Sequence, residues 1–80
     1  MFKEEVQTLL SDFGFEETFN KTLEGANLTH MMHCCSKLRK FVEYYIDSLG
    51  IIKSIWGFRL DDDVLMIENT VDFKIWLNKW

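Results

Sequence analysis

The side chains best suited to chemistry stand together in the middle of the chain, at His30, His33, Cys34 and Cys35. Imidazole and thiolate are ligands that zinc prefers, and on a helix His30 and Cys34 would share one side. No other histidine or cysteine is present in the sequence, so a tetrahedral site would need acids or a second copy to complete it. We therefore expect solvated histidines, Cys35 in the core with Cys34 beside it, no metal and no cofactor. Metal binding by His30, His33 and Cys34 stays open.

The same residues offer a thiol–imidazole pair, because Cys34 is close in sequence to His30 and His33. Nucleophilic catalysis would also need an orienting third group and an oxyanion hole, and no pattern in the sequence supplies them. The sequence also lacks a glycine-rich phosphate loop and a Ser-His-Asp spacing. These observations predict a protein that is not an enzyme.

Three consecutive acids, Asp61, Asp62 and Asp63, form the most concentrated charge in the chain. A calcium loop spaces its ligands and ends in a distant glutamate, and this run has neither feature. Short acidic side chains hydrogen-bond to their own backbone, so the run predicts a hairpin tip. At such a tip the three carboxylates would form an acidic finger that fits a basic groove on a partner.

Residues 28–49 carry the strongest structural pattern, an apolar repeat with a period of seven residues. Its members are Leu28, Met31, Cys35, Leu38, Val42, Tyr45 and Leu49. On a helix these side chains form one continuous stripe that must be buried. We expect one long central helix, capped at its start by Asn27 or Thr29 and closed by Gly50.

Weaker patterns flank this segment. Helical spacing predicts a first helix that ends at Gly14, and a second helix over residues 15–24, for which an irregular segment is the alternative. The tail, capped by Asn69 or Thr70, fits a short helix somewhat better than a third strand, because Trp76 breaks the alternation of a strand.

Between Gly50 and the tail, the apolar period changes to two, which predicts a β-hairpin with strands over residues 52–60 and 64–68. A three-residue loop would pair Phe58 with Met66, and a two-residue loop would pair Phe58 with Leu65, so the register stays open. Gly57 indicates a bulge. The predicted fold is α+β in one domain, residues 1–80: N-terminal helices that include the long central helix, then a hairpin and a short C-terminal helix or third strand.

Composition sets the class of protein. The chain has 80 residues, of which 48% are hydrophobic and 15% aromatic, and this predicts a folded domain. Its net charge of −4 argues against direct binding of nucleic acid and fits attraction to a basic protein surface. No apolar run approaches the roughly 20 residues that span a membrane. Two adjacent cysteines cannot form a disulfide that stabilises the fold, so we expect a cytoplasmic protein.

These features predict a small acidic protein-binding module, an inhibitor or immunity-type protein of the phage or mobile-element class. It would block a larger basic, nucleic-acid-handling protein. Exposed aromatic side chains make strong interface anchors, and exposed acids select a basic partner. The residues expected to contact the partner are Tyr44, Asp61, Asp62, Asp63, Trp76 and Trp80.

Three alternatives remain. A homodimeric structural or adaptor protein would pair its long helices through the apolar stripe. A metal-dependent regulator would use the cluster from His30 to Cys35. A winged-helix-like DNA-binding regulator would place Lys37, Arg39 and Lys40 in the major groove, with the hairpin as its wing.

Overall fold

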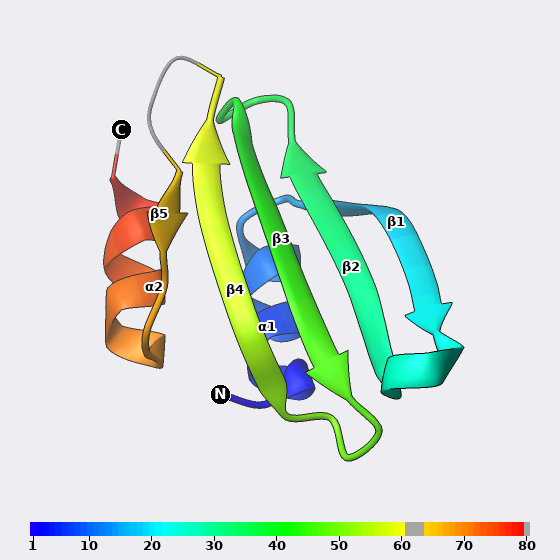
Figure 1. The fold of residues 1–80 in the computed structure, drawn as a ribbon. Coiled ribbons are helices and arrows are strands. Elements are labelled where there is room, and N and C mark those ends of the chain that lie inside the picture. The colour runs from blue at the N-terminus through cyan, green and yellow to red at the C-terminus, as the bar shows by residue number, and fades with distance from the viewer. Residues whose placement is uncertain (61–63, 80) are drawn as a thin grey trace.

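A computed structural model of the chain describes residues 1–60 and 64–79. Along the chain, one helix precedes five strands and a second helix follows them, with one short 3₁₀ turn between the first two strands (Figure 1). In chain order the elements are α1 (Lys3–Asp12), β1 (Glu16–Leu23), η1 (Glu24–Ala26), β2 (Leu28–Cys35), β3 (Lys40–Asp47), β4 (Ile52–Arg59), β5 (Leu65–Met66) and α2 (Thr70–Asn78).

The strands form a single antiparallel sheet in which each strand lies beside its sequence neighbours, in the order β1-β2-β3-β4-β5. Pairing runs along the whole of β2 and β3, with Leu28 opposite Asp47 and Cys35 opposite Lys40. β5 adds only two pairs at the edge, and one of them joins Met66 to Trp56. Such a meander needs only short connections, which antiparallel strands allow.

Both helices cover the same side of the sheet, which we call the covered face. Its buried strand residues alternate with half-buried residues of the opposite face, and β3 keeps this alternation along its whole length. Val6 and Leu10 from α1 and Phe73, Trp76 and Leu77 from α2 complete the core there. In Figure 1, α1 lies behind β3 and β4, and the other side of the sheet carries no helix.

The helix α1 ends where the sequence predicts. Glu5 Oε1 accepts a hydrogen bond from the backbone N–H of Phe2, at 3.0 Å, which satisfies one free donor at the helix start. Gly14 has a φ of +82°, the left-handed conformation that ends many helices and that glycine adopts without strain. The first helix of the prediction is therefore confirmed.

The helix α2 is held by a lysine in the sheet. Lys40 from β3 is 2% exposed, and its Nζ donates to the carbonyl oxygens of Trp76 at 2.8 Å, of Leu77 at 3.0 Å and of Lys79. The ammonium lies 5.0 Å from the centre of the Trp76 ring. Burial lowers the pKa of Lys40, and the charge of Arg59 lowers it further. Only the ammonium form, however, can donate all three hydrogen bonds to the helix end.

Trp76 packs on Gly57 of β4. A side-chain carbon at Gly57 would lie 2.8 Å from two ring atoms of Trp76, so only glycine fits beneath this ring. Gly57 pairs regularly with Val42 and Leu65, and the predicted bulge at this glycine is wrong. The tail is a helix, as we expect from Trp76, and Asn69 Oδ1 caps it by accepting from the N–H of Asp72 at 2.8 Å.

The predicted long central helix is wrong, because residues 28–49 form the hairpin of β2 and β3. The chain reverses over residues 36–39, where Arg39 adopts a φ of +57°. In a strand a spacing of seven alternates between the two faces, so the repeat is not one stripe: Cys35 lies on the covered face and Leu28 on the other. The predicted second helix is also wrong, because β1 occupies residues 16–23, where Thr18, Phe19 and Thr22 suit a strand.

The predicted β-hairpin is only part of the sheet. β4 confirms the strand predicted over residues 52–60, while β5 shortens the second strand to Leu65 and Met66. Met66 pairs with Trp56, a register that neither predicted loop length gives. The fold is α+β, but the predicted order of N-terminal helices followed by a hairpin is wrong. The chain instead forms a short helix, then a five-stranded sheet, then a second short helix.

Candidate binding surface on the open face of the sheet

The strand β2 separates the residues that a helix would have grouped. His33 and Cys35 lie on the covered face, and His30 and Cys34 lie on the opposite face. His33 Nε2 shares a hydrogen bond of 2.8 Å with the Tyr44 hydroxyl, whereas His30 Nε2 bonds to Glu43. Among residues 1–60 and 64–79, no group of three His, Cys, Asp or Glu side chains is placed to hold a metal ion.

The two cysteines occupy different environments and neither bonds to a histidine in the described chain. Cys35 is buried, and its Sγ donates weakly to the carbonyl oxygen of Phe13 at 3.7 Å. Cys34 is half-buried and free. The thiol–imidazole pair considered from the sequence is therefore not assembled by the fold.

The residues predicted to contact a partner fall into two groups. Tyr44 is 0% exposed and Trp76 is 7% exposed, and both belong to the core on the covered face. Asp61, Asp62, Asp63 and Trp80 lie outside the described residues, so a role for them in binding stays a prediction.

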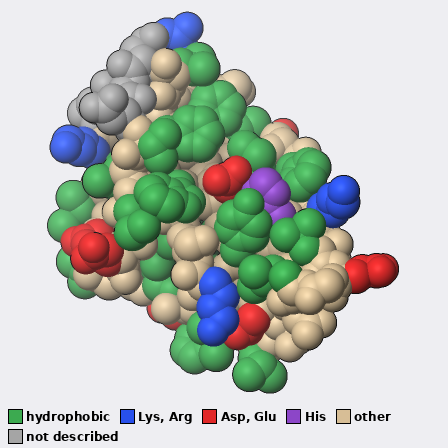
Figure 2. All heavy atoms as spheres, in the orientation of Figure 1, with side chains coloured by type: hydrophobic (Ala, Val, Ile, Leu, Met, Phe, Trp, Pro, Cys, Tyr) green, Lys and Arg blue, Asp and Glu red, His purple; other side chains and the backbone are tan. Residues whose placement is uncertain are grey.

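The side of the sheet without helices is unusually apolar, and we call it the open face. It is made by the strand residues that alternate with the buried ones. Its members from β1 to β5 are Phe19, His30, Met32, Cys34, Phe41, Glu43, Tyr45, Trp56, Phe58 and Met66. Figure 2 shows this side as a broad hydrophobic area around an acidic side chain and a histidine.

The aromatic side chains of the open face are held by one another. Phe41 and Phe58 stack across β3 and β4, with ring centres 5.2 Å apart and planes 10° from parallel. His30 stacks on Tyr45 at 4.5 Å, and Phe19 meets the edge of His30 at 5.1 Å. Such contacts fix side-chain conformations before any partner arrives, which lowers the entropy lost on binding.

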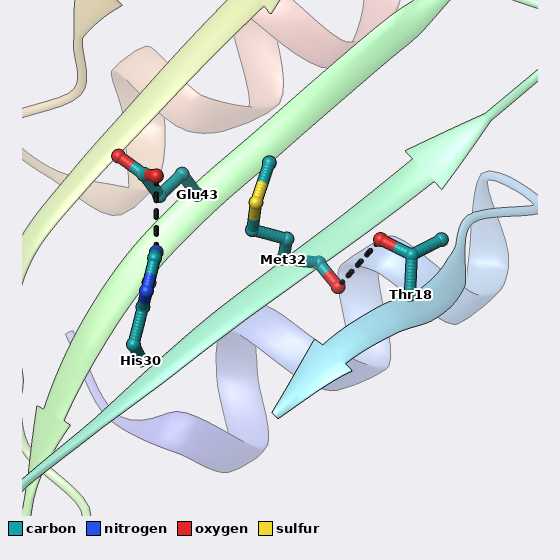
Figure 3. A network of polar contacts seen from close by, with 4 residues as sticks. All are labelled: Thr18, His30, Met32 and Glu43. Atoms are coloured by element: carbon teal, nitrogen blue, oxygen red, sulfur yellow. Dashed lines mark hydrogen bonds and ion pairs between the residues drawn. The ribbon is translucent and has the colours of Figure 1, made fainter. Parts of the chain in front are cut away.

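An ion pair lies within this apolar surface. His30 Nε2 and Glu43 Oε2 are 3.0 Å apart, and the two side chains are 20% and 32% exposed. Figure 3 shows them projecting toward each other from β2 and β3, while Thr18 of β1 reaches the backbone of Met32. The Thr18 hydroxyl donates to the Met32 carbonyl oxygen at 3.3 Å, beside the bulge of β1.

The outer strand β1 extends the open face beyond the helix layer. All eight of its residues are exposed, and at one edge of the described sheet it pairs with β2 alone. Phe19 is 41% exposed and lies on the open face beside Met32, its cross-strand partner. β1 therefore exposes both its side chains and, along its outer edge, backbone groups that no described strand pairs with.

The polar network beneath the sheet is structural. Tyr44 OH is bonded to His33 and also accepts from Gln7 Nε2 of α1 at 3.3 Å. Burial raises the pKa of Tyr44 and lowers the pKa of His33, so both are uncharged at neutral pH.

At the β3–β4 turn, hydrogen bonds from the N–H groups of Ile51 and Leu49 lower the pKa of Asp47.

A groove on the helix side is another candidate site among the described residues. It lies between α1 and α2, has a volume of about 350 Å³ and is lined by Glu4, Glu5, Thr8, Leu9, Thr70 and Lys74. A hydrogen bond of 3.3 Å from Thr70 Oγ1 to Glu5 Oε2 joins the two helices there. This groove has few apolar side chains, and the open face is the stronger candidate for binding.

Comparison with protein-family models, with curated proteins and with solved structures gave no match to this chain. Within the described residues, neither helix has the length and apolar content to span a bilayer. The candidate site therefore rests on the geometry of the sheet itself. Sequence reasoning missed it, although aromatic and methionine residues at alternate positions of residues 28–59 signal a sheet with two apolar faces.

Proposed function

We propose that this protein is a small, non-enzymatic binding protein that attaches to a larger protein through the open face. The observation that supports this function is the aromatic and methionine surface on β1 to β5, left uncovered while both helices occupy the other face. A monomeric protein rarely exposes a large contiguous apolar area without using it. Tyr, Trp, Phe and Met are also the residues enriched in protein interfaces.

The partner we propose is a basic, nucleic-acid-handling protein, which this protein blocks in the cytoplasm as an inhibitor or immunity-type protein of the phage or mobile-element class. The net charge of −4 supports a basic partner, as do Glu16 and Glu17 at the exposed start of β1. Complementary charge raises the rate of association and selects among apolar partners.

A charge placed in the open face tests this proposal. We expect Trp56→Lys or Phe58→Lys to weaken binding to the purified target at least about 30-fold, because loss of a central aromatic anchor costs about 2 kcal/mol or more. Val71→Lys is the matched control, because Val71 is 66% exposed on α2, on the helix side. Each variant is checked for its fold by circular dichroism.

Targets are identified by affinity capture with the wild-type protein and with the Val71→Lys control. Proteins that are also captured by the Trp56→Lys variant are discarded as background. A protein retained by the first two and lost from the third is then titrated by calorimetry, and its nucleic-acid binding is measured with and without this protein. Equal retention by the wild-type protein and both variants, or a target whose nucleic-acid binding is unaffected, would reject the proposal.

A homodimer is the second candidate, because the same open face could stack on the open face of another copy as in a β-sandwich. Sedimentation velocity at micromolar concentration separates the two functions. A dimer that becomes a monomer in the Phe58→Lys variant supports the second function. The homodimer has less support, because it would bring the Glu43 carboxylates of both copies into one apolar interface.

A further inference from the structure

Glu43 is surrounded by apolar and aromatic side chains in the middle of the open face. Met32 of β2 and Trp56 of β4 lie directly opposite it on the two neighbouring strands. Phe41 and Tyr45 follow on the same side of β3. Directly opposite residues such as Met32 and Trp56 stand about 4.5–5.5 Å from Glu43 at Cβ, so they are its nearest cross-strand neighbours.

The hydrogen bonds of Glu43 are incomplete. Its contact to His30 uses Oε2, and among the described residues no donor reaches Oε1. The side chain is 32% exposed, so water can reach it. A partner that covers the open face removes that water, and a buried carboxylate with an unsatisfied oxygen is strongly unfavourable. A complementary partner must therefore supply a donor, and a cation satisfies the charge as well.

We propose that Glu43 receives an arginine side chain of the partner protein, in a proposal that rests on the function proposed above. A guanidinium is planar, donates two parallel hydrogen bonds to a carboxylate and stacks on aromatic rings. Trp56 and Tyr45 flank Glu43 and offer such rings. A lysine ammonium is more strongly hydrated and makes no flat contact, so arginine fits this site better.

Isolated amino-acid probes test the site without the partner. Protein labelled with ¹⁵N is titrated with N-acetyl-arginine-N-methylamide, with the lysine analogue and with the uncharged citrulline analogue. We expect amide shifts at Glu43, Tyr45 and Trp56 that saturate in the millimolar range for arginine, are weaker for lysine and are absent for citrulline. In the Glu43→Gln variant the affinity for arginine should fall at least about threefold. Equal responses to arginine and citrulline would overturn the proposal.

Once the target is identified, Glu43→Gln should weaken its binding about tenfold or more, because the variant loses the charge that strengthens the hydrogen bonds to the guanidinium. Glu24→Gln is the control, since Glu24 carries the same charge in η1, away from the open face. Equal losses in the two variants would mean that only net charge matters, and would overturn the arginine site. The loss caused by Trp56→Lys would still support the binding function in that case.

Single-stranded nucleic acid is the other ligand that stacks on aromatic strands. The same amides are therefore followed with a ten-nucleotide oligothymidine. Saturable shifts with the oligonucleotide and none with arginine would replace the arginine site by a base-stacking surface. No response to the oligonucleotide, with a response to arginine, supports the proposal.

Discussion

Replacement of Gly57 by alanine tests how α2 is attached to the sheet. The new Cβ would lie 2.8 Å from Cε2 and Cζ2 of Trp76, whereas non-bonded carbons prefer about 3.5–4.0 Å. The ring must therefore retreat by roughly 0.7 Å or more. It has little freedom to do so, because the Trp76 carbonyl is bonded to Lys40 and the ammonium lies over the ring.

The expected cost follows from two opposing terms. Overpacking of a core costs about 1–3 kcal/mol, while alanine gains about 0.5–1 kcal/mol over glycine by losing less backbone freedom. We expect Gly57→Ala to lower the free energy of unfolding by about 1–2 kcal/mol. For a domain of this size that lowers Tm by roughly 4–16 °C, measured by urea and thermal unfolding monitored by circular dichroism.

A double-mutant cycle with Trp76→Leu separates the clash from other effects of the alanine. Trp76→Leu removes the ring that opposes the new methyl group, so in that background Gly57→Ala should be neutral or stabilising. The coupling between the two sites should then be about 1 kcal/mol or more. If Gly57→Ala costs the same with and without the tryptophan ring, the account of this contact is refuted.

Three further predictions concern the covered face. Lys40→Met should lower the free energy of unfolding by about 2–4 kcal/mol, because three carbonyl oxygens at the end of α2 lose their donor; unchanged hydrogen exchange in α2 would contradict this. Tyr44→Phe, which loses bonds to His33 and Gln7, should cost about 1–3 kcal/mol in urea unfolding, and a cost below about 0.5 kcal/mol would disprove the network. Burial lowers the pKa of His33 below its usual 6.5, so the unfolded chain binds a proton more tightly than the folded one. The free energy of unfolding therefore falls as the pH drops from 6.5 through the folded-state pKa. His33→Gln should flatten this pH dependence, and an equally steep profile in the variant would argue against it.

The two ends of the chain could be predicted from sequence, because their signals are local. Gly14 and Asn69 mark helix boundaries through backbone conformation and capping, which depend on few neighbours. The strand β4 was likewise evident from its alternation. Local patterns of this kind survive in the fold when tertiary contacts do not oppose them.

The centre of the chain was misread because neither face of its hairpin is polar. Buried Met31 and Val42 alternate with Met32 and Phe41 of the open face, so the usual contrast between core and solvent residues is missing. Lys40 also misleads, because in the sequence a lysine indicates a solvent-exposed position, whereas this lysine is buried. Its three acceptors lie at the end of α2 and in the following residue, Lys79, 36 to 39 residues away, and no local pattern reveals them.

The candidate binding surface was missed for the same reason. The aromatic residues include side chains on both faces of the sheet, but the predicted fold placed Tyr44 and Trp76 at the surface, and both are buried. The face of a strand on which a residue lies depends on register, and register is set by turns such as the one at Arg39. A left-handed arginine has no sequence signature.

Alternate residues of β3 are under different constraints, because one set fills the core and the other forms the open face. Its even-numbered residues, from Lys40 to Ile46, are buried, while Phe41, Glu43 and Tyr45 face outward. Under the proposed binding function, substitutions at the odd positions would alter the binding surface while leaving the buried side chains of β3 in place. Insertion of a single residue would exchange the two sets, so this lineage should vary by replacement and not by change of length in its central strands.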